Sequence, residues 1–192
     1  MTINITIGRI ERCATEAIVN PANGGLRRGG GACGHIFAAV ERAGGVDRLE
    51  AACRAIGRCP TGSAVTTPSF GLPSKFIIHA VGPVWSDGNR DTITTNDLSP
   101  AERRDLLLLK STYEAVLAEC RANGIASVSI PAISTGIFRV PKEFGAAIAH
   151  AVCRSQNDVA VTLVAFDEEN HRYLTAAPGS VATTVLRQAG II

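Results

Sequence analysis

The chain has 192 residues, of which 46% are hydrophobic and 19% are charged. This length and composition fit one folded domain and exclude a disordered acidic or basic chain. Lys and Arg outnumber Asp and Glu by 19 to 17, and the resulting net charge of +2 argues against strong non-specific binding to nucleic acid.

Hydrophobic periodicity and glycine or proline breaks outline the first half of the chain. Residues 20–34 contain too much glycine for regular structure. The elements that we expect are an alternating strand at residues 3–7, a buried strand at 17–19, a helix through 36–43, a helix through 46–56 with Ile56 on its inward face, a short strand within 59–73 and a strand at 76–81.

The second half opens with a polar segment, residues 86–98, which lacks periodicity and which we interpret as an exposed insertion. Ser99-Pro100-Ala101-Glu102 then forms a capping box with proline at the first helical position, which predicts the start of a long helix. The elements that we expect are this helix to about residue 123, a strand at 125–130, a helix from 141, a strand at 159–166 and helices at 168–177 and 181–188.

Strands that alternate with helices along a chain are typical of an α/β fold. We therefore expect a three-layer α/β/α sandwich with a mixed, largely parallel central sheet. No repeat, low-complexity tract or linker interrupts the sequence, so residues 1–192 are predicted to form a single domain.

The six cysteines and four histidines form no metal-binding or catalytic-triad pattern. We expect reduced thiols in a cytoplasmic protein, without a metal or a cofactor. The charged N-terminus does not fit a signal peptide, and the apolar run at residues 76–86 is too short to span a membrane. We interpret His79 as a strand histidine near the core.

Two loops that follow predicted strands carry the functional argument, because α/β sheets place ligands at such loops. In the first loop, residues 20–34, the triplet Gly29-Gly30-Gly31 precedes a helix whose N-terminal N–H groups can bind an anion. The second loop, residues 131–141, contains a small polar turn of hydroxyl and N–H groups. The second loop could be an ordinary turn, an explanation that the glycine triplet before a helix makes less suitable for the first, and either loop alone is a weak signal. The two together predict a clamp on a diphosphate, whereas Ser134 lacks the GxSxG context of a serine hydrolase.

Six motifs cover nearly the whole chain in order. They are IVNPAN at residues 18–23, GGGACG at 29–34, CPTGSAVTT at 59–67, FIIHAVGPVW at 76–85, PAISTGIF at 131–138 and VAFDEENHRY at 164–173. On these motifs the chain resembles the macrodomain family, which binds ADP-ribose. Within that family it is similar to the bacterial MacroD-type ADP-ribosyl hydrolases and O-acetyl-ADP-ribose deacetylases.

The resemblance implies that the two loops wrap the diphosphate of ADP-ribose. It also implies that Asn23 contacts the distal ribose and supports hydrolysis, that Phe138 lies against the sugar-phosphate and that Phe166 lies beside the adenine. Asn23 and Cys33 are the catalytic candidates. The residues implied to bind ADP-ribose are Arg9, Ile10, Asn20, Ala22, Asn23, Gly29, Gly30, Gly31, Ala32, Cys33, Ser134, Thr135, Gly136, Ile137, Phe138 and Phe166.

Two positions depart from the family pattern. Macrodomains usually carry an Asp in a GDI triplet, and Arg9 stands there in this chain. Because arginine cannot accept a hydrogen bond from adenine, we expect a weak base preference, with the backbone of Ile10 still able to bond the base. MacroD-type enzymes usually read GGGxDGAIH, where this chain has Cys33 for the Asp and Phe37 for the His.

The replacement at residue 33 excludes carboxylate catalysis there and leaves a substrate phosphate oxygen to orient the attacking water. The dipole of the following helix is expected to lower the pKa of the Cys33 thiol. A bound diphosphate is expected to raise that pKa again by like-charge repulsion.

The first functional hypothesis is an ADP-ribosyl ester hydrolase, acting on ADP-ribosylated acidic residues of proteins or on O-acetyl-ADP-ribose. The second is a non-catalytic reader of ADP-ribose. A third, a module that binds nucleotides or RNA ends, is weakened by the near-neutral charge and the 5% aromatic content. The expected partners are ADP-ribose or an ADP-ribosylated protein, with no membrane and no nucleic acid, and the chain is expected to be a monomer.

Overall fold

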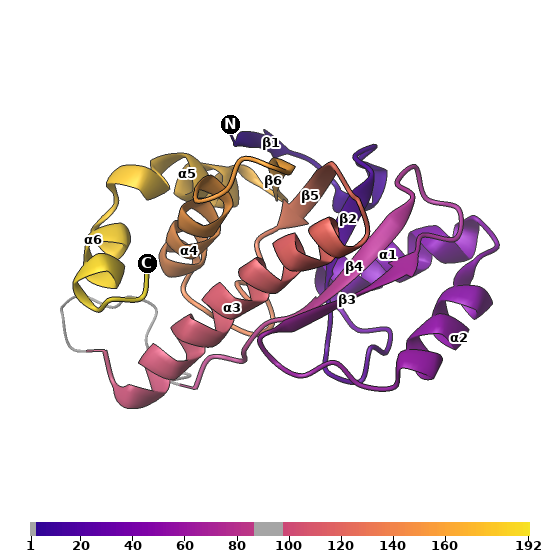
Figure 1. The fold of residues 1–192 in the computed structure, drawn as a ribbon, viewed down its shortest axis with the longest axis horizontal. Helices are drawn as coiled ribbons and strands as arrows, with labels where there is room; N and C mark the ends of the chain where they lie inside the picture. Colours follow the sequence, from indigo (N-terminus) through magenta and orange to yellow (C-terminus); the bar gives the residue numbers. More distant parts are fainter. Residues whose placement is uncertain (1–2, 87–97) are drawn as a thin grey trace.

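A central β-sheet organises the computed structural model, which describes residues 3–86 and 98–192. The strand order is β1-β6-β5-β2-β4-β3 (Figure 1). All described neighbours pair in parallel except β3 and β4, which confirms the expected mixed sheet. The strands are β1 (Asn4–Ile7), β2 (Ala17–Pro21), β3 (Ser63–Pro68), β4 (Phe76–Val81), β5 (Ser127–Pro131) and β6 (Ala160–Ala165).

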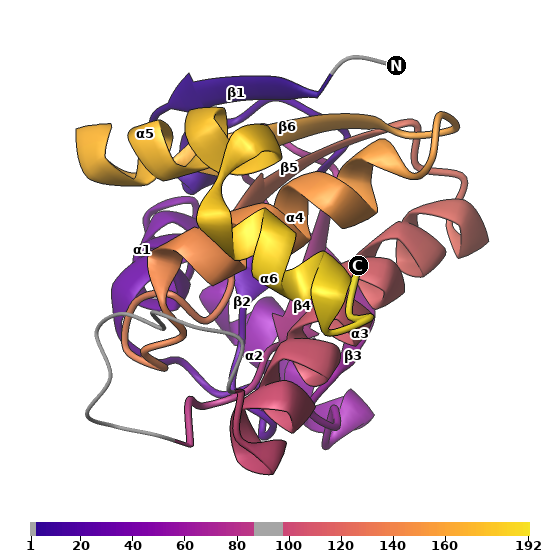
Figure 2. The same ribbon diagram turned by 90° about the vertical axis from the view of Figure 1, so that its left-hand side faces the viewer.

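Helices cover both faces of this sheet and complete the predicted three layers. On one face α1 and α2 pack in a core with Ile18 and Ile77, and on the other α3 to α6 pack in a core with Val19 and Ile130. Figure 2 shows β1, the strand nearest the N-terminus, beside β6, the last strand of the chain. The helices are α1 (Gly31–Arg42), α2 (Val46–Ile56), α3 (Pro100–Ala122), α4 (Lys142–Arg154), α5 (Glu168–Ala176) and α6 (Val181–Gln188), with short 3-10 helices at Ile10–Arg12 and Ala177–Gly179.

The capping box predicted before α3 is present. The Ser99 hydroxyl accepts a hydrogen bond from the N–H of Glu102 at 3.2 Å, and the Glu102 carboxylate accepts one from the N–H of Ser99 at 2.7 Å. The apolar spacing of this helix predicts one inward face, and the side chains of that face are buried. They are Leu106, Leu109, Tyr113, Val116, Leu117 and Cys120. The described helices lack the combination of length and apolarity that a membrane crossing needs.

Three details of the sequence prediction need correction or lie outside the structure. Helix α1 begins at Gly31, inside the segment expected to be irregular, because the first N–H groups of a helix need no intrahelical partner and glycine is tolerated there. Ile56, expected to face inward, is 38% exposed at the end of α2. Of the predicted insertion at 86–98, residues 87–97 lie outside the described residues.

The position of the two loops follows from how the strands are arranged. Strands β2 and β5 are neighbours in the sheet, with Ala17 opposite Val128. The chain leaves β2 toward α1 on one face and leaves β5 toward α4 on the other. The first and second loops therefore diverge from adjacent carboxyl ends, which is the switch point where open α/β sheets hold their ligands.

Candidate functional site

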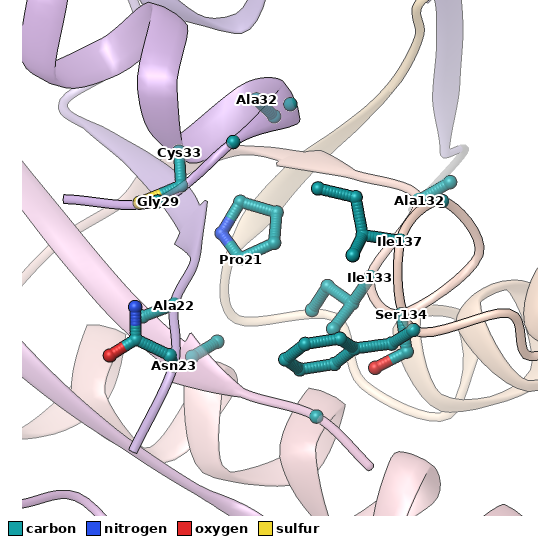
Figure 3. Close-up of a pocket in the computed structure, with 16 residues that line it drawn as sticks. Pro21, Ala22, Asn23, Gly29, Ala32, Cys33, Ala132, Ile133, Ser134 and Ile137 are labelled. Atoms are coloured by element: carbon teal, nitrogen blue, oxygen red, sulfur yellow. The ribbon is translucent and has the colours of Figure 1, made fainter. Parts of the chain in front are cut away.

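A pocket of about 260 Å³ lies at this switch point, between the first and second loops. Figure 3 shows Asn23 and Cys33 on one side of it and Ser134 and Ile137 on the opposite side. The lining residues come from the two loops and the end of β4. They are Pro21, Ala22, Asn23, Gly29, Gly30, Gly31, Ala32, Cys33, Ala80, Gly82, Ala132, Ile133, Ser134, Gly136, Ile137 and Phe138.

The first wall of the pocket is the N-terminus of α1. Gly30 is the N-cap residue, and no described side chain caps this helix end. The first N–H groups of the helix, at Gly31, Ala32 and Cys33, have no intrahelical acceptor by the geometry of an α-helix. All three residues line the pocket, so this wall offers N–H donors and the positive end of the helix dipole to an anion.

The second wall is a tightly bent turn in the second loop. Ser134 and Arg139 adopt left-handed backbone conformations, with φ of 64° and 60°, and the N–H of Val140 donates to the carbonyl of Ser134 at 3.0 Å. No described group accepts a hydrogen bond from the N–H groups of residues 135–138. Successive free N–H groups in such a turn form a concave anion site, so both walls present donors rather than acceptors.

Buried contacts behind the second wall hold this turn in place. The N–H of Ile133 donates to the buried hydroxyl of Tyr113 at 3.2 Å. The main chain at Gly82 lies so close that a Cβ there would be 2.1 Å from the Ser134 hydroxyl oxygen and 2.8 Å from Ile133. Ser134 is itself only 6% exposed, and no described group bonds its hydroxyl. The glycine at 82 is therefore required for the shape of the pocket.

Asn23 lies at the edge of the pocket and is bound to its own loop. Its side-chain NH₂ donates to the carbonyl of Arg27 at 2.7 Å, and its side-chain oxygen accepts from the N–H of Arg27 at 3.2 Å. These two bonds give the amide a single orientation, and they close the loop between β2 and α1. A carboxamide held this way can position a ligand hydroxyl or a water.

The structure corrects the expectation for the Cys33 thiol. Burial raises its pKa above the ordinary value of 9.0, and this effect exceeds the opposing hydrogen bonds from Gly29 and Asn20 and the charge of Arg28. The sequence argument weighed the helix dipole against a bound diphosphate and left out burial. Cys33 is only 5% exposed, and burial disfavours a thiolate. The thiol is thus neutral at pH 7 before any ligand binds.

Among its described lining residues the pocket has no Asp, Glu, Lys, Arg or His side chain. The described residues also contain no group of three His, Cys, Asp or Glu side chains placed to hold a metal ion. An anion in the pocket would be bound by backbone dipoles and hydroxyl groups. No charged side chain of the pocket is available there as a general base.

A smaller hollow of about 30 Å³ adjoins the pocket at Ala32, which lines both. We call it the aromatic shelf. The exposed ring of Phe166 stacks on His35, with ring centroids 6.3 Å apart, and the guanidinium of Arg9 lies 6.0 Å from the Phe166 ring centroid. Arg9 also pairs with the buried carboxylate of Glu11 at 3.7 Å. The shelf has the flat apolar surface that a nucleobase requires.

Most of the residues predicted for the site converge on these two hollows, with Arg9, Ile10 and Phe166 at the shelf. Two do not line either of them. The hydroxyl of Thr135 donates to the carbonyl of Ala132 at 3.1 Å. Asn20 is 1% exposed, and its side-chain NH₂ lies 3.0 Å from His79 Nδ1.

The contact with Asn20 explains the core histidine that the sequence predicted. Because an amide NH₂ can only donate, Nδ1 of His79 accepts, and Nε2 carries the proton toward the Thr67 hydroxyl at 2.9 Å. Burial lowers the pKa of His79 to about 4. Asn20 and His79 therefore support β2 from behind the pocket.

Sequence reasoning missed five lining residues, which are Pro21, Ala80, Gly82, Ala132 and Ile133. All are apolar or lack a side chain, so no chemical signal singled them out. Pro21, Ala132 and Ile133 lie within the two predicted loops, and Ala80 and Gly82 lie at the end of the neighbouring strand β4. Position in the chain was therefore the available indication.

Comparisons with known proteins agree with this geometry. A solved Oceanobacillus iheyensis macrodomain mutant with ADPR superimposes with a TM-score of 0.75 at 30% identity, covering 91% of this chain and 90% of that one. The O-acetyl-ADP-ribose deacetylase 1 of Pantoea vagans is 39% identical over 88% of this chain and 94% of its own length. The O-acetyl-ADP-ribose deacetylase of Escherichia fergusonii is 37% identical over 88% and 91%. The family model described as Macro domain matches residues 19–149, and the chain belongs to this family.

Proposed function

We propose that this protein binds ADP-ribose in the pocket and hydrolyses ADP-ribosyl esters, either O-acetyl-ADP-ribose or ADP-ribosylated carboxylates of proteins. The observation that carries the proposal is the pair of facing walls, the N-terminus of α1 and the turn at residues 134–138, which both present free N–H groups. Two such walls suit a diphosphate, which carries acceptor oxygens on both phosphates. The names of the relatives from Pantoea vagans and Escherichia fergusonii support the reaction.

The order of the hollows gives the orientation of the ligand. The aromatic shelf with Phe166 takes the base, and the pocket between the two walls takes the diphosphate. The distal ribose then lies at the opposite end of the pocket, beside Asn23. The ester to be cleaved sits on this ribose, next to the amide that the Arg27 backbone holds in place.

The reaction adds one water across the ester and releases ADP-ribose and a carboxylic acid, which loses its proton to solvent. The pocket supplies no charged side chain that could activate the water, and the Cys33 thiol is neutral. A phosphate oxygen of the substrate accepts the hydrogen bond that orients the water. Asn23 positions the ribose, and holding both reactants in this geometry supplies the rate enhancement.

A non-catalytic reader is the second candidate, and the same pocket chemistry favours it. A site without an ionised side chain can bind a diphosphate with its backbone dipoles and still lack the means to activate water. The two candidates predict the same affinity for ADP-ribose and differ only in turnover.

The test measures binding and turnover together. Titration calorimetry with ADP-ribose should show binding, and free ligand at 100 times Kd should stabilise the fold by about 2.7 kcal/mol. Single-turnover reactions with O-acetyl-ADP-ribose and with an ester-linked ADP-ribosyl protein should release ADP-ribose. Binding without release of product would favour the reader hypothesis over the hydrolase hypothesis. A titration that shows no binding would refute both hypotheses.

A further inference from the structure

A second hollow, of about 640 Å³, lies on the far side of the first loop from the pocket. We call it the arginine cavity. Arg27 and Arg28 of the loop line it from one side, and Arg54 and Glu50 of α2 line it from the other. Three arginines and one glutamate give its wall a net positive charge.

The three guanidinium groups differ in whether a carboxylate already forms an ion pair with them. Arg28 pairs with Glu41 at 3.1 Å, and Arg54 pairs with Glu50 at 3.5 Å. Within the described residues, Arg27 has no carboxylate oxygen within 4 Å. Exposed ion pairs of this kind are weak and exchange readily with solvent or other carboxylates. The cavity can therefore accept carboxylates at Arg27 directly and at the other two by exchange.

The arginine cavity adjoins the end of the pocket where the ester would lie, and one loop separates the two. Asn23 and Gly29 line the pocket, and the residues between them, 25–28, line the cavity. The side chain of Asn23 bonds both the N–H and the carbonyl of Arg27. The aromatic shelf, the pocket and the arginine cavity thus adjoin in that order, joined first at Ala32 and then at the Asn23 loop.

We propose that the arginine cavity binds an acidic peptide segment next to the modified residue of an ADP-ribosylated protein, an inference that rests on the proposed function. A protein attached through its carboxylate to the distal ribose leaves the pocket beside Asn23, where the cavity begins. Aspartate and glutamate side chains in the flanking segment match the planar, multiply donating guanidinium groups. O-acetyl-ADP-ribose has no such segment and does not reach the cavity.

A nucleic acid fits the same surface less well. Proteins that hold single strands stack the bases on aromatic side chains, and the described wall of the cavity has none. Glu50 in the wall and Glu41 beside it would also repel a continuous phosphate backbone.

The charge reversal Arg54→Glu tests the proposal, because Arg54 is exposed on α2 and lies outside the pocket. The matched control is Arg172→Glu on α5, at the opposite end of the molecule (Figure 1). Each variant is assayed with three substrates: O-acetyl-ADP-ribose, an ADP-ribosylated peptide with acidic flanks and the same peptide with neutral flanks. The affinity of each ligand is measured in parallel.

We expect Arg54→Glu to weaken binding and lower kcat/KM for the acidic peptide about tenfold, in a salt-dependent way. The neutral peptide, O-acetyl-ADP-ribose and the Arg172→Glu control should be unchanged. Equal loss on all ligands, or no loss on the acidic peptide, overturns the proposal. An ADP-ribosylated oligonucleotide serves as a fourth ligand for binding, and a larger effect of Arg54→Glu on it than on the acidic peptide also overturns the proposal. Failure of the proposed function would appear separately, as absent ADP-ribose binding or O-acetyl-ADP-ribose turnover in the unsubstituted chain.

Discussion

Removing the Cys33 side chain tests whether its thiol takes part in the reaction or only fills space in the structure. With a pKa above 9.0, less than about 1% of the thiol is ionised at pH 7. A thiolate base would make the rate rise about tenfold for each pH unit up to that pKa. Because we assign water activation to the substrate phosphate, we expect the unsubstituted protein to have a flat single-turnover rate between pH 7 and pH 9.

We expect Cys33→Ala to retain most of its activity and to lose only about 1 kcal/mol of stability, the scale for one buried heavy atom. Asn23→Ala should lose about 10²-fold in rate, the scale for a misplaced reacting group. The reason is that it removes both bonds to the Arg27 backbone. Cys13→Ala, a half-buried cysteine outside the pocket, is the control for general effects of losing a thiol.

The assay is single-turnover hydrolysis of an ester-linked ADP-ribosyl protein from pH 6 to pH 9, with ADP-ribose affinity measured on each variant. A Cys33→Ala protein that binds normally but no longer reacts would refute the reasoning. So would a wild-type rate that climbs with pH and a flat profile for Cys33→Ala, because both results would make the thiolate the base.

Three further predictions concern the walls and the support of the site. Gly82→Ala should abolish ADP-ribose binding in calorimetry and cost about 1–3 kcal/mol in urea unfolding, since its Cβ would lie 2.1 Å from the Ser134 oxygen; Gly179→Ala, which meets nothing within 4 Å, should do neither. Arg9→Gln removes the cation–π contact with the Phe166 ring and should weaken ADP-ribose binding by about 0.5–1 kcal/mol. An unchanged affinity would show that this contact does not contribute to binding. Burial lowers the pKa of His79 from 6.5 to about 4, so its contribution to stability is complete above pH 6.5 and falls as the pH drops toward 4. Urea unfolding should show a loss of about 2 kcal/mol between pH 6.5 and pH 5, and His79→Gln should remove that slope.

Local sequence determined which segments are helices and strands, because the signals are local ones. The capping box at Ser99 starts α3 where it was expected, and the apolar run at 76–81 is β4 to the residue. Glycine and hydroxyl residues after two strands also singled out the two loops that line the pocket. These signals depend on backbone propensity and hydrophobic periodicity, which are set by residues close together in the chain and need no contact with distant segments.

Only the tertiary structure decided that β2 and β5 are neighbours, and hence that the two loops face each other across one pocket. The strand order depends on packing between segments more than 100 residues apart, for which the sequence has no local signal. The raised pKa of Cys33 has the same origin, because burial by side chains from distant parts of the chain outweighs the hydrogen bonds and the Arg28 charge that lower it. The closeness of Gly82 to Ser134 and the position of the arginine cavity beside Asn23 likewise follow from how the elements pack.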